Sequence, residues 1–350
     1  MAKRLDKHSR APTMVDVAKA AGVSIATVSA AINGSAPVSS ELKGRIEKAI
    51  RQVGYKANPF ARSLKTGTTS TIGLMVADIT NPFFTTVIHA IQDVAHRESY
   101  SVILCCSDED AAKEQTHLRV LSDRRVDGFI IASAGETPEL RALVNDPRTP
   151  VVLVDRLIAG LQTDAVVIDN VEATQNAVGH LIAAGHRRIG LITGRRSLST
   201  GRERYQGYRR ALADAGLPYE PALVGTAHFG DEDGYRAAAK LLALKKPPTA
   251  IFACNNLSGL GLMRAIHEAG LACPKDIAVA CFDDFDWAEV FHPRLTTIAQ
   301  PTKAIGRQAM LLLLERLRQR DADQMPPRVV RLKAELKVRD SSAPPAPGRS

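Results

Sequence analysis

Polar and charged side chains stand directly after several short apolar runs of the chain, where parallel strands would end. They are Asp155 and Arg156 after 151–154, Asn255 after 250–254, Asp283 after 278–282, and Ser199, Thr200 and Arg204 after 189–193. In an open parallel sheet, small molecules bind outside the carboxyl ends of the strands. The chain therefore offers groups that could hydrogen-bond a small polar molecule.

Short Val- and Ile-rich runs alternate with helical segments from about residue 71 onward. The expected strands are 72–76, 102–105, 129–132, 151–154, 165–168, 189–192, 250–254, 278–282, 296–299 and 329–332. The expected helices are 84–98, 112–124, 139–144, 171–184, 202–215, 234–244, 257–269 and 302–318. This pattern indicates α/β lobes with parallel sheets covered on both faces. It restarts at 165, so we expect two lobes, with 296–332 crossing back to complete both.

Positive charge is concentrated at the start of the chain. The first 67 residues carry 12 Lys and Arg against 4 Asp and Glu, whereas the rest of the chain carries 34 against 33. A small basic unit beside a nearly neutral large one implies a polyanionic partner for the small unit only.

Three short helices are predicted in this basic unit. They cover 14–21, 25–32 and about 39–54. Asp16 stands three residues after Thr13, a variant of the capping box, and Ser24 can cap the second helix. Asn33 and the glycine after it end that helix. Two short helices across a glycine turn form a helix-turn-helix, and the third closes an all-α bundle.

These residues resemble the headpiece of the lactose-repressor (LacI/GalR-type) family of bacterial transcription regulators. The likeness covers 15–24, 26–29, 32–34, 54–59 and 61–64, and in the large unit 78–84, 125–128, 185–189, 199–208 and 295–301. It implies a headpiece and hinge helix followed by a two-lobed, periplasmic-binding-protein-like domain. It also implies a homodimeric repressor that binds a palindromic double-stranded operator under the control of a small-molecule effector.

The second helix is expected to meet the DNA. Short polar groups suited to phosphate contacts are Ser24, Thr27, Ser29 and Asn33, and the resemblance adds Thr13 and Tyr55. The family's base-reading positions correspond to Ile25, Ala26 and Ala30, which are all apolar here. Direct readout is then limited to thymine methyls, so we expect specificity to shift toward DNA shape and half-site arrangement.

Residues 58–67 are predicted to form a hinge helix. Asn58 can cap it, and the helix is so short that we expect order only with a partner chain and DNA. By resemblance, Leu64 would wedge into the minor groove while Arg62 and Lys65 meet phosphates, and Ala61 belongs to the same element.

The resemblance also implies an effector site in the cleft between the lobes. Hydrogen bonds would come from Asp155, Arg204, Asn255 and Asp283, aided by Arg156 and Thr200, with Phe83, Phe84 and Phe229 lining the cleft. This set favours a sugar or sugar derivative, and the two arginines leave a sugar acid or phosphate open. A purine is the second choice, although Leu198 stands where the purine-repressor branch has an Arg. Asn256 stands where the family commonly has an Asp, so whether a lobe contact or a helix cap is retained there stays open. Inducer and co-repressor roles both stay open.

Other classes lack their marks in the sequence. No phosphate-loop, dinucleotide, hydrolase-elbow or zincin motif occurs, so we expect no enzyme, cofactor or metal. The alternatives are a sugar-binding protein, or an α/β enzyme with an appended DNA-binding domain. Five scattered cysteines suit reduced thiols. No apolar run spans a bilayer and no secretory h-region follows the N-terminus, so we expect a cytoplasmic protein without a membrane partner.

The expected domain boundaries follow from these elements. The headpiece occupies 1–57, the hinge 58–67 and the effector-binding and dimerisation domain 68–340. Residues 341–350, rich in Pro and Ser, are expected to be a disordered tail. Because the tail has no leucine heptads, we expect dimers and not tail-linked tetramers.

Overall fold

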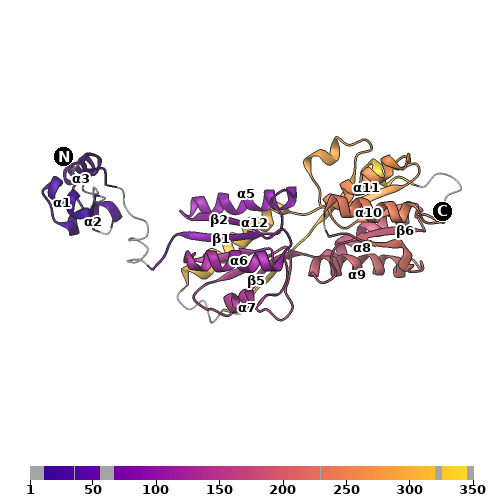
Figure 1. Ribbon diagram of the computed structural model, residues 1–350, viewed down its shortest axis with the longest axis horizontal. Helices are drawn as coiled ribbons and strands as arrows, with labels where there is room; N and C mark the ends of the chain where they lie inside the picture. The colour runs from indigo at the N-terminus through magenta and orange to yellow at the C-terminus, as the bar shows by residue number, and fades with distance from the viewer. Residues whose placement is uncertain (1–11, 35, 56–66, 229, 320–324, 345–350) are drawn as a thin grey trace, which may run out of the picture. The chain divides into compact units, whose positions relative to one another are not determined.

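The computed structural model describes residues 12–34, 36–55, 67–228, 230–319 and 325–344 (Figure 1). The chain divides into two compact units between Thr69 and Ser70. Residues 58–66 of the predicted hinge and Phe229 fall outside the described residues.

The first unit is the predicted three-helix bundle. Its helices are α1 (Met14–Ala21), α2 (Ile25–Asn33) and α3 (Ser40–Val53). Asp16 Oδ2 accepts hydrogen bonds from the backbone N–H and the hydroxyl of Thr13, at 2.8 and 2.7 Å, which fixes the start of α1. Gly22 follows α1 with a φ of 66°, a left-handed conformation that suits glycine. The apolar faces of the helices enclose a small core of Val17, Ala18, Ala21, Val28, Ile46 and Ala49.

The first lobe of the second unit is a six-stranded parallel sheet. Its strands are β1 (Thr71–Val76), β2 (Ser101–Cys106), β3 (Gly128–Ile131), β4 (Val151–Val154), β5 (Asp164–Ile168) and β11 (Val329–Leu332), in the order β11-β5-β4-β3-β1-β2. Helices α5 (Pro82–Arg97) and α12 (Thr302–Arg318) cover one face, and α6 (Ala111–Asp123) and α7 (Pro138–Val144) cover the other (Figure 1). Both faces are buried because alternate residues of β1 enter different cores: Leu74 packs in the core with α5 and α12, and Met75 in the core with α6 and α7.

The second lobe repeats this architecture. Its strands are β6 (Ile189–Thr193), β7 (Val224–Thr226), β8 (Ala250–Ala253), β9 (Ala278–Phe282), β10 (Thr296–Ala299) and β12 (Glu335–Lys337), in the order β12-β10-β9-β8-β6-β7. Its helices are α8 (Asn170–Ala183), α9 (Ser199–Asp214), α10 (Asp231–Leu242) and α11 (Asn256–Glu268), with short 3-10 turns at 221–223, 286–289 and 340–342. All strand pairs are parallel except β10 with β12. The short strands β7 and β12 were not predicted.

The chain passes between the lobes three times. It leaves the first lobe after β5, returns after β10 to form α12 and β11, and leaves again to form β12. The crossing back of 296–332 is therefore confirmed. The restart of the pattern at residue 165 was misread, because the strand there pairs with β4 and β11 in the first sheet. The second lobe begins with α8.

The expectation of a disordered tail from residue 341 is wrong at its start. Ser341 and Ser342 are buried in the second lobe. Ser341 Oγ donates to the carbonyl of Val279 at 2.7 Å and accepts from the backbone N–H of Thr296 at 2.8 Å. Serine in a Pro- and Ser-rich stretch can satisfy buried backbone groups at strand ends, which composition does not reveal. Residues 345–350 lie outside the described residues.

Within the described residues, no single helix combines the length and the apolar character of a membrane span. Met14–Ala21 and Ile25–Ile32 pass such a test only as a pair, bent by 104°. All five cysteines carry free thiols, as expected.

Candidate functional site

The start of α2 presents an accessible face in the first unit. Ser24 caps the helix, its Oγ accepting from the backbone N–H of Thr27 at 3.1 Å. Ser24, Ile25 and Ala26 are exposed, and 48% of Ile25 is open to solvent. An exposed branched apolar side chain at a helix start is available for contact with a partner.

The remaining headpiece residues named from the sequence have mixed positions. Thr27, Ser29 and Ala30 are half-buried, Thr13 precedes α1, and Asn33 is the last residue of α2. Tyr55 packs against the headpiece core. Asn58, Ala61, Arg62, Leu64 and Lys65 lie outside the described residues.

The second unit contains a cavity of about 380 Å³ between its two lobes, at the carboxyl ends of the strands. Its wall contains every effector residue named from the sequence that the structure describes. These are Phe83, Phe84, Asp155, Arg156, Thr200, Arg204, Asn255 and Asp283. Residues that the sequence reasoning did not assign to the site also line it: Asp78, Thr80, Asn81, Asp108, Glu109, Arg195, His228, Gly230 and Gln300.

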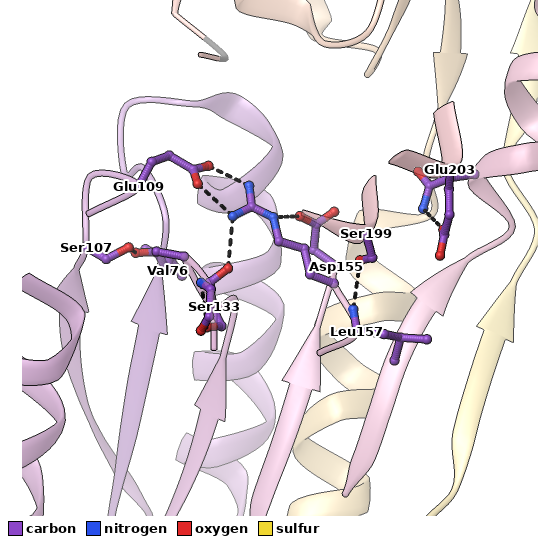
Figure 2. A network of polar contacts seen from close by, with 12 residues as sticks. Val76, Ser107, Glu109, Ser133, Asp155, Leu157, Ser199 and Glu203 are labelled. Atoms are coloured by element: carbon purple, nitrogen blue, oxygen red, sulfur yellow. Dashed lines mark hydrogen bonds and ion pairs between the residues drawn. The ribbon is translucent and has the colours of Figure 1, made fainter. Parts of the chain in front are cut away.

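Arg156 is held in a buried ionic network of the first lobe. Its Nη1 and Nη2 donate to the two carboxylate oxygens of Glu109 at 2.8 and 2.5 Å, and Nη1 also donates to the carbonyl of Ser133 at 3.0 Å. Its Nε lies 3.2 Å from Asp155 Oδ2. Figure 2 shows Glu109 and Asp155 meeting this guanidinium from opposite sides. Only 4% of Arg156 is exposed, so the cation is neutralised inside the protein.

Arg204 is fixed in the second lobe. Its Nε donates to Asn170 Oδ1 at 2.8 Å, and its Nη1 donates to the carbonyl of Cys254 at 2.6 Å. The guanidinium carbon lies 3.6 Å from the centroid of the Phe282 ring, a cation–π arrangement. These contacts hold the guanidinium in one orientation in the cavity wall.

The two buried aspartates of the cavity wall share an unusual backbone. Asp155 and Asp283 have φ values of 67° and 69°, a region that few residues other than glycine adopt and that is frequent at binding sites. Asp283 accepts a hydrogen bond from Gln300 Nε2 at 2.6 Å. Burial raises the pKa of Asp283 to about 6, although Arg204 and Gln300 oppose this shift. Burial also raises the pKa of Asp155.

Three further groups complete the wall. Asn255 Oδ1 accepts from the backbone N–H of Ser258 at 3.0 Å, so it caps α11 as well as facing the cavity. The buried hydroxyl of Thr200 has no hydrogen-bond partner in the described part of the chain, and it is therefore available to a ligand. Phe83 and Phe84 meet edge to face with their centroids 4.9 Å apart.

Hydrogen bonds between described residues join the lobes around the cavity. Asn256 Nδ2 donates to Asn81 Oδ1 at 2.9 Å. A contact between the lobes is therefore retained, although this position is Asn and not the Asp that is common in the family. Arg195 Nη1 donates to the backbone carbonyl of Glu109 at 2.9 Å. The backbone N–H of Leu157 donates to Ser199 Oγ at 3.0 Å, as Figure 2 shows.

Some of the cavity-wall residues that were not predicted could have been found from the sequence, and others could not. Asp78 follows β1 and Asp108 follows β2, so the rule of polar residues after strands could have found them. Glu109 stands between Asp108 and Asp110, so the sequence does not distinguish it from these acidic neighbours. Nothing in the sequence indicates that it pairs with Arg156. Gln300 sits one residue after β10, whose place in the second sheet only the fold reveals.

The first unit is a helical headpiece of a DNA-binding type, and the second unit has two lobes around a central cavity. Together they define a regulator that binds DNA and responds to an effector. The family described as "Bacterial regulatory proteins, lacI family" matches residues 13–58, and a "Periplasmic binding protein-like domain" matches residues 178–342. The HTH-type transcriptional repressor PurR of Pasteurella multocida is 36% identical over 330 residues, which cover 94% of this chain and 98% of that one. The chain belongs to the lacI family of bacterial transcription regulators, and its family consists of regulators and not of enzymes.

Two solved structures are similar over most of their length. One is a lac repressor dimer bound to operator and the anti-inducer ONPF, with 25% identity, a TM-score of 0.83 and coverage of 95% of this chain and 100% of that chain. The other is a LacI family regulator from Enterococcus faecium with bound ribose, with 33% identity, a TM-score of 0.70 and coverage of 78% and 99%. The predicted family and fold are thus confirmed.

Proposed function

We propose that this regulator represses transcription as a homodimer whose two headpieces bind the half-sites of a palindromic operator. Residues 1–57 form the headpiece and 58–67 the hinge that couples it to the effector domain. The exposed start of α2, with Ser24, Ile25 and Ala26, enters the major groove. Twelve basic residues in the first 67 supply the attraction to phosphates, so operator affinity falls steeply with salt.

The DNA contacts can be separated by substitution. Thr13, Ser29, Ala30, Asn33 and Tyr55 complete the proposed surface of the headpiece. In the hinge, Leu64 wedges into the minor groove beside Asn58, Ala61, Arg62 and Lys65. Leu64→Ala is expected to abolish most DNA bending, measured by fluorescence energy transfer across a labelled operator. Equal bending by the variant and the parent would contradict the wedge.

The proposed effector is a polyhydroxyl compound, with a sugar or sugar derivative favoured. The observation that carries this proposal is the composition of the wall: paired charges, the fixed Arg204 and the unpartnered hydroxyl of Thr200. Asp155 and Asp283 accept hydrogen bonds from ligand hydroxyls, and Asn255 and Arg204 donate. The cavity volume of about 380 Å³ is in the range of small-ligand sites. The ribose-bound relative agrees with this class.

A purine is the alternative, favoured by the adjacent rings of Phe83 and Phe84 in the wall. Leu198, which stands where an Arg would assist a purine, is buried and does not line the cavity. This arrangement supports the sugar over the purine.

A thermal-shift screen of the full chain against sugars, sugar acids and purines tests the ligand class. A ligand present at 100 times its Kd stabilises the native state by about 2.7 kcal/mol. We expect a sugar to raise the Tm of the parent and to lose that effect in Asp283→Asn. Stabilisation by purines alone would overturn the sugar assignment. Operator gel shifts with and without the hit then decide between inducer and co-repressor.

A further inference from the structure

Glu109 has a position that neither the family likeness nor the proposed function assigns. It follows β2 in the first lobe, is buried, and its carboxylate binds both terminal nitrogens of Arg156. Bidentate pairing of this kind uses the donors with which a guanidinium would otherwise bind a carboxylate or phosphate. A ligand anion would therefore have to displace Glu109 to reach Arg156.

Arg156 makes two further contacts within the protein. Nη1 makes a second contact with the carbonyl of Ser133, and Nε faces Asp155. All of these partners lie in the first lobe, so the pairing does not depend on closure of the cavity. The arginine that looks available in the sequence beside Asp155 is therefore committed to the protein.

The buried charges of the wall do not favour an anion. Glu109, Asp155 and Asp283 provide three carboxylates, against the guanidiniums of Arg156 and Arg204. The half-buried Arg195 is turned to the lobe contact, since its Nη1 donates to the backbone carbonyl of Glu109. A buried anion without a free cation to pair with it bears a large desolvation cost.

We propose that Glu109 is a specificity-determining residue, which excludes anionic ligands from the cavity by occupying Arg156. This inference rests on the proposed effector cavity and narrows its ligand to neutral compounds, so that sugar phosphates and sugar acids are rejected. It reverses the reading of the two neighbouring arginines as a possible anion site.

Inorganic phosphate is a sufficient probe, because the inference concerns charge and not the shape of the natural effector. In Glu109→Gln the side chain keeps its size and can accept one hydrogen bond, but Arg156 loses one of its two neighbouring carboxylates and one acceptor for its terminal nitrogens. We expect phosphate to raise the Tm of Glu109→Gln in a saturable way at constant ionic strength. The apparent phosphate affinity should be at least about tenfold above that of the parent protein.

Two variants control the experiment. Glu136→Gln removes an exposed carboxylate from the same lobe, where Glu136 pairs with Arg141, and it should bind phosphate no better than the parent. The double variant Glu109→Gln/Arg156→Gln should lose the gain. Phosphate held by the basic headpiece is common to the parent and all of the variants, and it cancels in the comparison.

The result that overturns the proposal is specific. The proposal fails if the parent protein already shows saturable phosphate binding that Arg156→Gln removes. It also fails if Glu109→Gln gains no affinity for phosphate, or if the gain persists in the double variant. The parent measurement stands even if Glu109→Gln does not fold. Failure of every sugar to bind would refute the proposed sugar effector and leave this result unchanged.

Discussion

Asp283 is predicted to lower the stability of the protein that carries it. Its pKa rises from 3.8 in the unfolded chain to about 6 in the folded protein because the carboxyl is buried. Each unit of pKa difference corresponds to about 1.4 kcal/mol. The ionised carboxylate therefore costs the folded state about 3 kcal/mol, which Asp283→Asn removes while keeping the size of the side chain and an acceptor for Gln300.

The pH dependence of the free energy of unfolding shows in which pH range the charge of Asp283 destabilises the protein. Below pH 4 the carboxyl is protonated in the folded protein and largely so in the unfolded chain, so no penalty exists. Between pH 4 and 6 only the unfolded chain loses the proton, and the free energy of unfolding falls as the pH rises. Above pH 6 the full penalty is present. Asp283→Asn should therefore be more stable than the parent by about 3 kcal/mol at pH 7.5 and equal to it near pH 4.

Urea unfolding followed by the fluorescence of Trp287 measures this difference. Trp287 is the single tryptophan of the chain and lies in the second lobe, with its ring 5.1 Å from that of Phe285. Asp146→Asn is the matched control, because its hydrogen bonds with Arg148 lower the pKa of Asp146 and its removal should not stabilise the protein. If Asp283→Asn is destabilised by the same amount at every pH, the burial argument is wrong.

Three further predictions concern the lobe contact, the headpiece and the C-terminal segment. Asn256→Ala removes the hydrogen bond to Asn81 and should open the lobes of the ligand-free protein. Small-angle scattering would then measure a larger radius of gyration. Gln175→Ala loses a hydrogen bond to Asp214 within one lobe and should leave the radius of gyration unchanged. Ser24→Ala should cost about 1 kcal/mol of headpiece stability and should weaken operator binding. Ser39→Ala, which removes the cap of α3, should cost stability alone. If the two variants bind the operator with equal affinity, Ser24 does not contact the DNA phosphates. Ser341→Ala leaves the backbone N–H of Thr296 without its partner and should lower the stability of the second lobe by about 1 to 3 kcal/mol in a urea titration; an unchanged midpoint would mean that the buried turn at 340–342 is dispensable.

The sequence predicted those parts of the molecule that depend on local pattern. Buried strands such as β4 and β9 are continuous apolar runs, and the polar residues after them, Asp155 and Asp283, do line the cavity. The helices of the headpiece were found from caps and spacing because Ser24 and the glycine turn act within a few residues.

What the sequence did not reveal depends on contacts between distant segments. Pairing of Arg156 with Glu109 joins residues 47 positions apart, and neither residue type indicates its partner. Strand β5 has β11 as its other neighbour in the sheet, more than 160 residues later, which no local pattern indicates. Ser341 looked like tail composition because its partners, Val279 and Thr296, come from other strands.

The threefold passage of the chain between the lobes has a consequence for synthesis on the ribosome. The first lobe takes its outer strand β11 and its covering helix α12 from the last part of the chain, so its sheet stays incomplete until about residue 332 has emerged. The headpiece is complete some 280 residues earlier and can fold as a unit, as N-terminal domains generally do. A nascent chain thus carries a folded basic headpiece while its ligand-binding body is still unfinished, and neither lobe can be produced by itself as an uninterrupted fragment.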